Sequence, residues 1–192
     1  MNSLITFGIS FTTALQSMGT WLEAPMKFFS FLGSENFFLI VLPLVYWSID
    51  AALGIRIGFI LIAGASLTEC AKMALHGPRP YWVSTNVRAM ASDPRFGVPS
   101  GHAEIGAGVW GIVAATYRKA WVWVAAVLLV SFIGVSRLYL GAHFPQDVLT
   151  GWVLGFLTLW AFVRFREPVE GRVKKISLGS GFPAERCGPL QN

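Results

Sequence analysis

Long apolar runs, separated by short polar segments, dominate the pattern of this chain. The runs are rich in Leu, Ala, Val, Gly and Trp, and each is too long for a β-strand. Five stand out, at Ser34–Ile49, Ile57–Leu75, Gly101–Tyr117, Ala120–Ser136 and Asp147–Val163. A helix needs roughly 20 residues to cross the bilayer core, so some runs must extend into their flanks or thin the bilayer. The pattern predicts an all-α, polytopic transmembrane helical bundle with five clear spanning helices.

Composition supports a membrane protein over a soluble helical one. Hydrophobic residues make up 54% of the 192 residues and charged residues 13%, whereas soluble domains carry about 25% charged residues. The net charge of +5 does not indicate nucleic-acid binding, because the basic residues do not form a patch on a soluble domain. If the five helices alternate, Arg56, Arg118, Lys119 and the basic run from Arg164 to Lys175 share one side. That side is cytoplasmic by the positive-inside rule, and the loops 77–99 and 138–146 lie on the other side.

The two ends of the chain differ from the apolar middle. Within residues 1–32, Leu4, Phe11 and Leu15 recur at helical spacing among serines and threonines. This favours an amphipathic helix that lies in the membrane interface, with a sixth spanning helix as the alternative. Residues 33–166 form the transmembrane domain. Periodicity is lost from Glu167 onward, so residues 167–192 are predicted to form a polar flexible tail.

Four polar clusters converge on the extracytoplasmic ends of the predicted helices. They are Lys72 with Arg79, Ser100-Gly101-His102, Arg137, and His143 with Asp147. The free N–H groups at a helix N-terminus favour an anion, and guanidinium groups match the oxygens of a phosphate. The clusters therefore predict a phosphate site at this membrane face.

Two histidines and a carboxylate add chemistry to binding. His143 and Asp147 are four residues apart, so one helical turn would place the carboxylate beside the imidazole. A hydrogen bond to one ring nitrogen would fix the tautomer and leave the other nitrogen as a nucleophile. A protonated His102 would then donate a proton to the departing alkoxide. This predicts phosphoryl transfer through a phosphohistidine, with lysine and arginine in place of metal ions and no cofactor.

The order and spacing of these residues resemble a known family. The segments are Lys72-x6-Arg79-Pro80, Pro99-Ser100-Gly101-His102 and Ser136-Arg137-x5-His143-x3-Asp147. Together they are similar to the three-part signature of the type 2 phosphatidic acid phosphatases, over about residues 33–163. The resemblance implies that His143 is the nucleophile, Asp147 its orienting partner and His102 the acid. It further implies that the phosphate is held by Lys72, Arg79, Ser100, Gly101 and Arg137.

The spanning helices favour the lipid phosphatase branch of that family over its soluble acid phosphatases and vanadate-dependent haloperoxidases. Members usually have six spanning helices, and bacterial lipid phosphatases act away from the cytoplasm. We therefore expect a protein of the bacterial inner membrane that removes a terminal monoester or diphosphate group from a lipid at the periplasmic face. Its lipid phosphate substrate would enter the site from the bilayer, and the surrounding membrane lipids would be its other partners. A phosphotransferase to an acceptor alcohol, and a catalytically silent lipid-binding or transport protein, are the alternatives.

Residues outside the signature have two interpretations each. Glu104, just after His102, either shapes substrate choice and the pKa of His102 or forms a structural hydrogen bond between helices. Trp82, beside Arg79-Pro80-Tyr81, is either an interfacial or packing residue like the other tryptophans or a lipid contact. Arg88 and Arg95 are expected to be solvated loop charges, unless either binds a second phosphate of a diphosphate substrate.

Overall fold

The computed structural model describes residues 3–179, with the side chains of residues 3–165. The described residues form helices and no strand, which confirms the all-α class. The elements are α1 (Ser3–Ser17), the 3-10 turn η1 (Thr20–Leu22), α2 (Glu23–Leu32), α3 (Glu35–Ser48), α4 (Ala51–Leu75), α5 (Pro80–Val83), α6 (Gly101–Tyr117), α7 (Ala120–Tyr139) and α8 (Pro145–Gly179). The chain divides into two compact units after Leu159. The first unit holds every predicted site residue.

Local side-chain chemistry explains where several helices begin and end. The Ser34 hydroxyl accepts a hydrogen bond from the N–H of Phe37 at the start of α3, and Asp50 caps α4 in the same way. His76 takes a left-handed conformation (φ 48°) at the end of α4 and is followed by Gly77 and Pro78. Such caps satisfy backbone groups that a helix end leaves unpaired. These ends therefore follow from local sequence.

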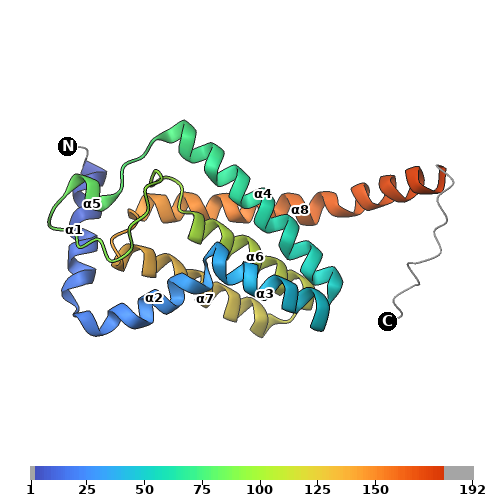
Figure 1. Ribbon diagram of the computed structural model, residues 1–192, viewed down its shortest axis with the longest axis horizontal. Coiled ribbons are helices and arrows are strands. Elements are labelled where there is room, and N and C mark those ends of the chain that lie inside the picture. The colour runs from blue at the N-terminus through green and yellow to red at the C-terminus, as the bar shows by residue number, and fades with distance from the viewer. Residues whose placement is uncertain (1–2, 180–192) are drawn as a thin grey trace. The chain divides into compact units, whose positions relative to one another are not determined.

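Helix α6 lies in the middle of the first unit and packs against α4 and α7. In Figure 1 these helices run lengthwise, while α1 lies across one of their ends. Helix α8 approaches α6 through Gly151 and Gly155, where an added methyl group would collide with the carbonyl oxygens of Ser100 and Glu104. The close approach places the start of α8 directly against the start of α6. The site residues at these two helix starts are therefore brought together.

The expected number of five spanning helices is not confirmed. By length and composition, three segments of the described residues can cross a membrane: Ala51–Val83, Ala120–Tyr139 and Pro145–Phe165. The pair Thr20–Leu32 and Glu35–Ser48, bent by 53°, adds a fourth if it forms one broken span. Helix α6 has 17 residues and α3 has 14, so each is shorter than the roughly 20 residues that a straight crossing requires.

The N-terminal segment is two helices where one was expected. The chain turns at Gly19 (φ 116°), a conformation that favours glycine, so α1 and α2 take different directions. Gln16, near the end of α1, is buried and donates to the carbonyl oxygens of Arg88 (2.9 Å) and Tyr139 (3.0 Å). Helix α2 packs along α7 and belongs to the bent pair with α3.

The far end of the chain also differs from expectation. Helix α8 continues to Gly179, past Glu167, where a flexible tail was expected to begin. Residues 180–192 of that expected tail lie outside the described residues.

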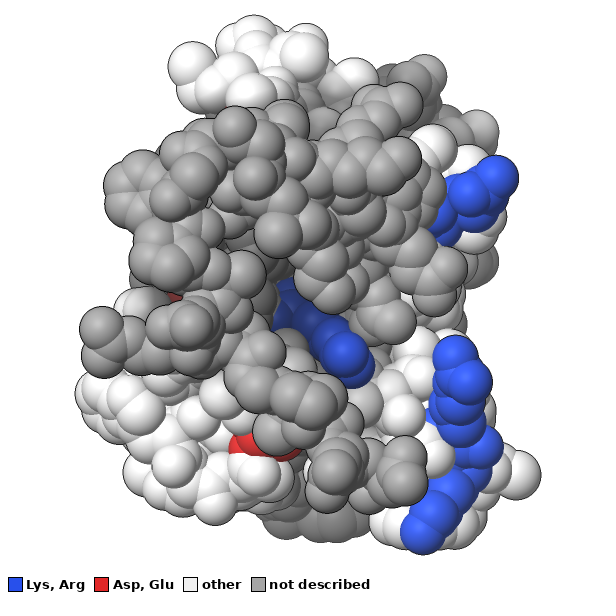
Figure 2. Space-filling view, turned by 90° about the vertical axis from the view of Figure 1, so that its right-hand side faces the viewer, with Lys and Arg blue, Asp and Glu red and all other residues white. Residues whose placement is uncertain are grey.

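Basic side chains gather at the end of the first unit where α4 begins and α6 ends. Arg56 there donates to the Thr116 hydroxyl (3.3 Å), and Arg118 and Lys119 form the turn between α6 and α7. Figure 2 shows this end, where Lys and Arg are more prominent than Asp and Glu. The three basic residues predicted to share one side therefore do lie at one end of the helices.

Candidate active site

A cavity of about 280 Å³ opens at the opposite end of the first unit, where α4 ends and α6 begins. Five predicted site residues line it: Lys72, Arg79, Gly101, His102 and His143. The other lining residues are Ser34, Glu35, Asn36, Asp93, Arg95 and Ile105. Segments far apart in the sequence thus meet at one cavity, as the alternation of helices predicts.

His143 lies in the loop before α8 and is almost fully buried. Its Nδ1 is 2.8 Å from the carbonyl oxygen of Gly97. A carbonyl oxygen can only accept a hydrogen bond, so Nδ1 carries the hydrogen and Nε2 carries the lone pair. The backbone of the loop before α6 therefore sets the tautomer of His143.

Asp147 does not make the hydrogen bond that its spacing from His143 suggests. Its Oδ2 lies 3.6 Å from Nδ1 of His143 and instead accepts the backbone N–H of Phe144 at 2.8 Å. The reason is that α8 begins at Pro145, so His143 and Asp147 do not share a regular helical turn. Asp147, in the first turn, caps the backbone of the helix start. It remains a buried carboxylate close to the imidazole.

The environment of His143 favours the neutral imidazole. Burial lowers the pKa of His143 well below its usual range, and the positive charges of Arg137 and Arg79 act in the same direction. The ring is therefore unprotonated at neutral pH, with the lone pair available on Nε2.

Arg79 ties two loops together beneath the cavity. It is fully buried, and its guanidinium donates to the carbonyl oxygens of Arg95 (2.7 Å), Ala142 (3.1 Å) and Phe96 (3.3 Å). It also pairs with Asp93 at 3.2 Å. The two loops carry Gly97 and His143, so Arg79 supports the hydrogen bond between them as well as facing the cavity.

Lys72, Arg137 and Ser100 complete the polar surroundings, and each is buried. The ammonium of Lys72 is 2.8 Å from Glu69, and Nη1 of Arg137 donates to the Ser30 hydroxyl. Among the described residues, Nε of Arg137 and Oγ of Ser100 have no hydrogen-bond partner. Buried polar groups without partners are costly, so these two atoms stand out among the described side chains near the start of α6 and the end of α7.

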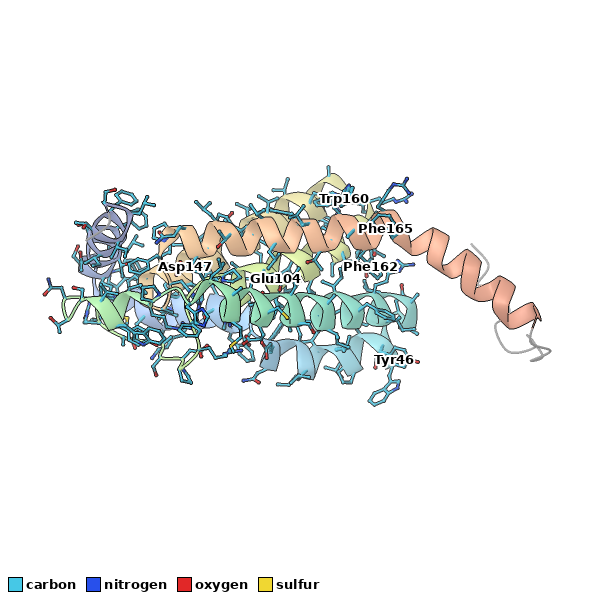
Figure 3. All side chains as sticks on the ribbon, turned by 90° about the horizontal axis from the view of Figure 1, so that it is seen from above. Tyr46, Glu104, Asp147, Trp160, Phe162 and Phe165 are labelled. Carbon is cyan, nitrogen blue, oxygen red and sulfur yellow. The ribbon has the colours of Figure 1, made fainter. Side chains whose placement is uncertain are left out.

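The other five predicted residues do not line the cavity; they are Ser100, Arg137, Asp147, Glu104 and Trp82. Glu104 is fully buried against Gly64 of α4, and within the described chain neither carboxylate oxygen has a hydrogen-bond partner. The interhelical hydrogen bond suggested for it is therefore not seen there. Figure 3 shows Glu104 on α6 and Asp147 at the beginning of α8. Trp82, in α5, is half-exposed, with its ring 6.3 Å from that of Phe96.

Sequence reasoning missed part of the cavity wall. Ser34, Glu35 and Asn36 enter from the start of α3, and Asp93 and Arg95 from the loop before α6. The polar residues Ser34, Glu35 and Asn36, at the start of an otherwise apolar run, were the sequence feature that could have indicated the contribution of α3. Arg95, expected to be a solvated loop charge, is 44% exposed in its side chain but lines the cavity.

Comparison with known proteins identifies the family of this chain. The PAP2 superfamily matches residues 53–169. Human glucose-6-phosphatase 3 is 32% identical over 88% of this chain and 56% of its own length, so the chain spans about half of that relative. An undecaprenyl-diphosphatase from Sulfolobus acidocaldarius is 27% identical over 81% of this chain and 75% of its own length.

A solved structure shows the same fold. The transmembrane PAP2 type phosphatidylglycerolphosphate phosphatase from Bacillus subtilis superimposes with a TM-score of 0.75, at 23% identity, over 88% of this chain and 89% of that structure. With three apolar helices long enough to cross a membrane, the chain is an integral membrane protein. It belongs to the PAP2 superfamily.

Proposed function

We propose that this protein is a membrane phosphatase that removes a terminal phosphate from a lipid phosphate through a phosphohistidine, without a metal ion or cofactor. The observation that carries the proposal is the setting of His143. Its Nδ1 is held by the Gly97 carbonyl, and it shares the cavity with His102 and the cations Lys72 and Arg79.

In the first chemical step, the lone pair on Nε2 of His143 attacks phosphorus. The P–N bond forms as the P–O bond to the leaving group breaks. Burial and the charge of Arg137 lower the pKa of His102 in the free protein, so His102 would take up its proton together with the bound phosphate anion and donate it to the departing alkoxide oxygen. In the second step, water attacks phosphorus while His102 accepts a proton. The P–N bond breaks, and inorganic phosphate leaves.

Fixed positive groups would stabilise the charge that develops on the phosphoryl oxygens. Lys72, Arg79 and Arg137 supply cations, and the backbone N–H of Gly101 supplies the N-terminal end of α6. The N–H of Ser100 instead donates to the carbonyl oxygen of Asp147 at 2.9 Å. The unpartnered Oγ of Ser100 and Nε of Arg137 fit the same role.

The membrane helices support a lipid substrate, because a lipid can reach the site laterally from the bilayer. The relationship to an undecaprenyl-diphosphatase points the same way. The basic end of the helices, with Arg56, Arg118 and Lys119, would face the cytoplasm. The cavity would then open on the extracytoplasmic side, which in a bacterium is the periplasm.

A second candidate substrate class is a water-soluble, hydroxyl-rich phosphate ester. It is favoured by the polar wall of Ser34, Glu35 and Asn36. Among the described lining residues, Ile105 is the one large aliphatic side chain. The similarity to glucose-6-phosphatase 3 is consistent with such a substrate.

The test is phosphate release by the detergent-purified protein from a panel of lipid phosphates, prenyl diphosphates and sugar phosphates, with EDTA present. Wild type should release phosphate and His143→Ala should not. Loss of release in EDTA, or full release by His143→Ala, would contradict the mechanism. Adding an acceptor alcohol separates hydrolysis from phosphotransfer, because transfer requires the acceptor. A folded protein inactive on the whole panel would favour the silent binding protein.

A further inference from the structure

Arg95 lies outside the three motifs, yet it connects the two cations of the first one. The ammonium of Lys72 is 2.8 Å from Oε1 of Glu69, and the same oxygen is 2.8 Å from Nη1 of Arg95. Nη2 of Arg95 is 3.0 Å from Oδ2 of Asp93, which is 3.2 Å from Nη2 of Arg79. Lys72, Glu69, Arg95, Asp93 and Arg79 thus form one chain of alternating charge, here called the charge chain.

The ends of the charge chain are buried and its middle is accessible. The side chains of Lys72 and Arg79 are 4% and 0% exposed, whereas those of Glu69 and Arg95 are 43% and 44% exposed. A buried cation requires a partner, and each end has one carboxylate. Arg95 contacts both of these carboxylates, so it is the one described residue that couples the two ends.

Arg95 is itself held by hydrogen bonds to Asp93. Its backbone N–H and its Nε both donate to Oδ1 of Asp93, at 2.9 and 3.1 Å. Burial alone would raise the pKa of Asp93, but hydrogen bonds from Arg95 and the charge of Arg79 outweigh it and hold this pKa at about 2. Asp93 is therefore ionised at physiological pH. Glu35 adds a more distant carboxylate, 3.8 Å from Nη1 of Arg95.

We propose that Arg95 is a positioning residue, which fixes the separation of Lys72 and Arg79 for phosphate by bridging Glu69 and Asp93. The planar guanidinium suits this task because its donors point in fixed directions toward two carboxylates at once; a lysine ammonium is a point charge on a flexible stem. The inference rests on the proposed function, since it concerns the phosphate site of the same cavity.

A simple effect of charge makes a different prediction from positioning. If only net charge mattered, Arg95→Gln would weaken phosphate binding, Glu69→Gln would strengthen it, and Arg95→Lys would behave like wild type. If the charge chain positions the cations, all three substitutions weaken binding, because each one breaks the chain. Arg88→Gln is the matched control: Arg88 lies in the same loop but donates to the Gln16 carbonyl, outside the charge chain.

The experiment measures thermal unfolding of the full-length protein in detergent at increasing concentrations of inorganic phosphate. Phosphate that binds the folded state raises the midpoint, so the dose reports affinity without requiring catalysis. We expect Arg95→Gln and Glu69→Gln to need roughly tenfold more phosphate than wild type for the same rise, and Arg95→Lys at least about threefold more. Arg88→Gln should match wild type.

Two results would overturn the inference while the proposed function stands: Arg95→Gln that binds phosphate like wild type, or Glu69→Gln that binds it more tightly. Steady-state kinetics give an independent readout, since lost uniform binding raises KM and leaves kcat nearly unchanged. If wild type neither responds to phosphate nor releases it from any substrate, the proposed function fails and the inference fails with it.

Discussion

At the residue scale, the geometry around His143 divides the work between a backbone carbonyl and Asp147, whereas Asp147 alone was expected to orient the imidazole. The Gly97 carbonyl accepts the hydrogen bond from Nδ1 of His143. Oδ2 of Asp147 lies 3.6 Å from Nδ1 and caps the start of α8. The tautomer of His143 should therefore survive the loss of the Asp147 charge. The contribution of Asp147 would be electrostatic, through the positive charge that forms on the imidazole as it attacks.

This division predicts an intermediate effect for Asp147→Asn. The amide oxygen can still accept the N–H of Phe144, so the helix start is kept, but the negative charge is lost. We expect kcat to fall by roughly 10²-fold, with unchanged folding, while His143→Ala is inactive. Steady-state kinetics on the substrate found by the panel test this. A kcat equal to that of wild type, or to the background of His143→Ala, would contradict it.

The burial of His143 also predicts a dependence of stability on pH. Its pKa in the folded protein lies well below the unfolded value of about 6.5. Between those two values the unfolded chain binds a proton that the folded protein does not. Stability from this group is therefore present above the unfolded pKa and is lost as pH falls toward the folded pKa, by at most about 1.4 kcal/mol per pH unit.

Thermal unfolding of wild type and His143→Asn from about pH 7.5 to about pH 5 measures this effect. The wild-type midpoint should fall more steeply with acidification than that of the variant. Parallel curves for the two proteins would show that His143 does not take up a proton on unfolding in this range.

At the element scale, α4 and α6 are held close by Gly64, whose missing side chain leaves room for the buried carboxyl of Glu104. We expect Gly64→Ala to cost about 1–3 kcal/mol through overpacking. Removing the obstructing group should reverse much of this, so Gly64→Ala combined with Glu104→Ala should be more stable than Gly64→Ala alone.

Unfolding midpoints of the single and double variants in detergent provide the measurement. Gly58→Ala is the control on the same helix, since its methyl group would meet only Leu42, at an ordinary 3.7 Å. Additive effects of Gly64→Ala and Glu104→Ala would show that the two residues do not share this space.

Helix α1 is joined to the loop before α6 by Gln16, which bonds to both the N–H and the carbonyl of Arg88. Replacing it with Ala leaves buried polar groups unpaired, which costs about 1–3 kcal/mol. We expect Gln16→Ala to loosen this connection, with faster hydrogen exchange in residues 84–97. Hydrogen exchange in the part of α7 that does not contact Gln16 is the internal reference. Unchanged exchange in residues 84–97 would show that Gln16 does not hold α1 to this loop.

At the scale of the whole molecule, the cavity and the basic residues Arg56 and Arg118 lie at opposite ends of the helices. The positive-inside rule then predicts one orientation in the membrane. In a variant with Cys70 and Cys187 replaced by Ser, Asn86→Cys in the exposed loop near the cavity should react with an impermeant maleimide in intact cells. Lys119→Cys, also exposed, should react only after permeabilisation. The reverse pattern would place the cavity in the cytoplasm.

Much of this architecture is determined by the sequence alone. Apolar runs of helical length, ended by Gly77-Pro78 or begun at Pro145, define the helices α4 and α8. Because successive helices alternate in direction, their ends must collect at two faces. The convergence of Lys72, His102 and His143 on one cavity follows from that alternation.

Other features were decided only by the tertiary structure. The hydrogen-bond partner of His143 is the backbone carbonyl of Gly97. Every residue has a backbone carbonyl, so the sequence does not distinguish Gly97 as the partner. The charge chain through Arg95 depends on distances between α4 and a loop more than twenty residues away. The path of α3, and the number of helices that cross the membrane, depend on bends and packing between segments. The spacing of residues within one helix can be taken directly from the sequence. These contacts, in contrast, form only when segments far apart in the sequence pack together.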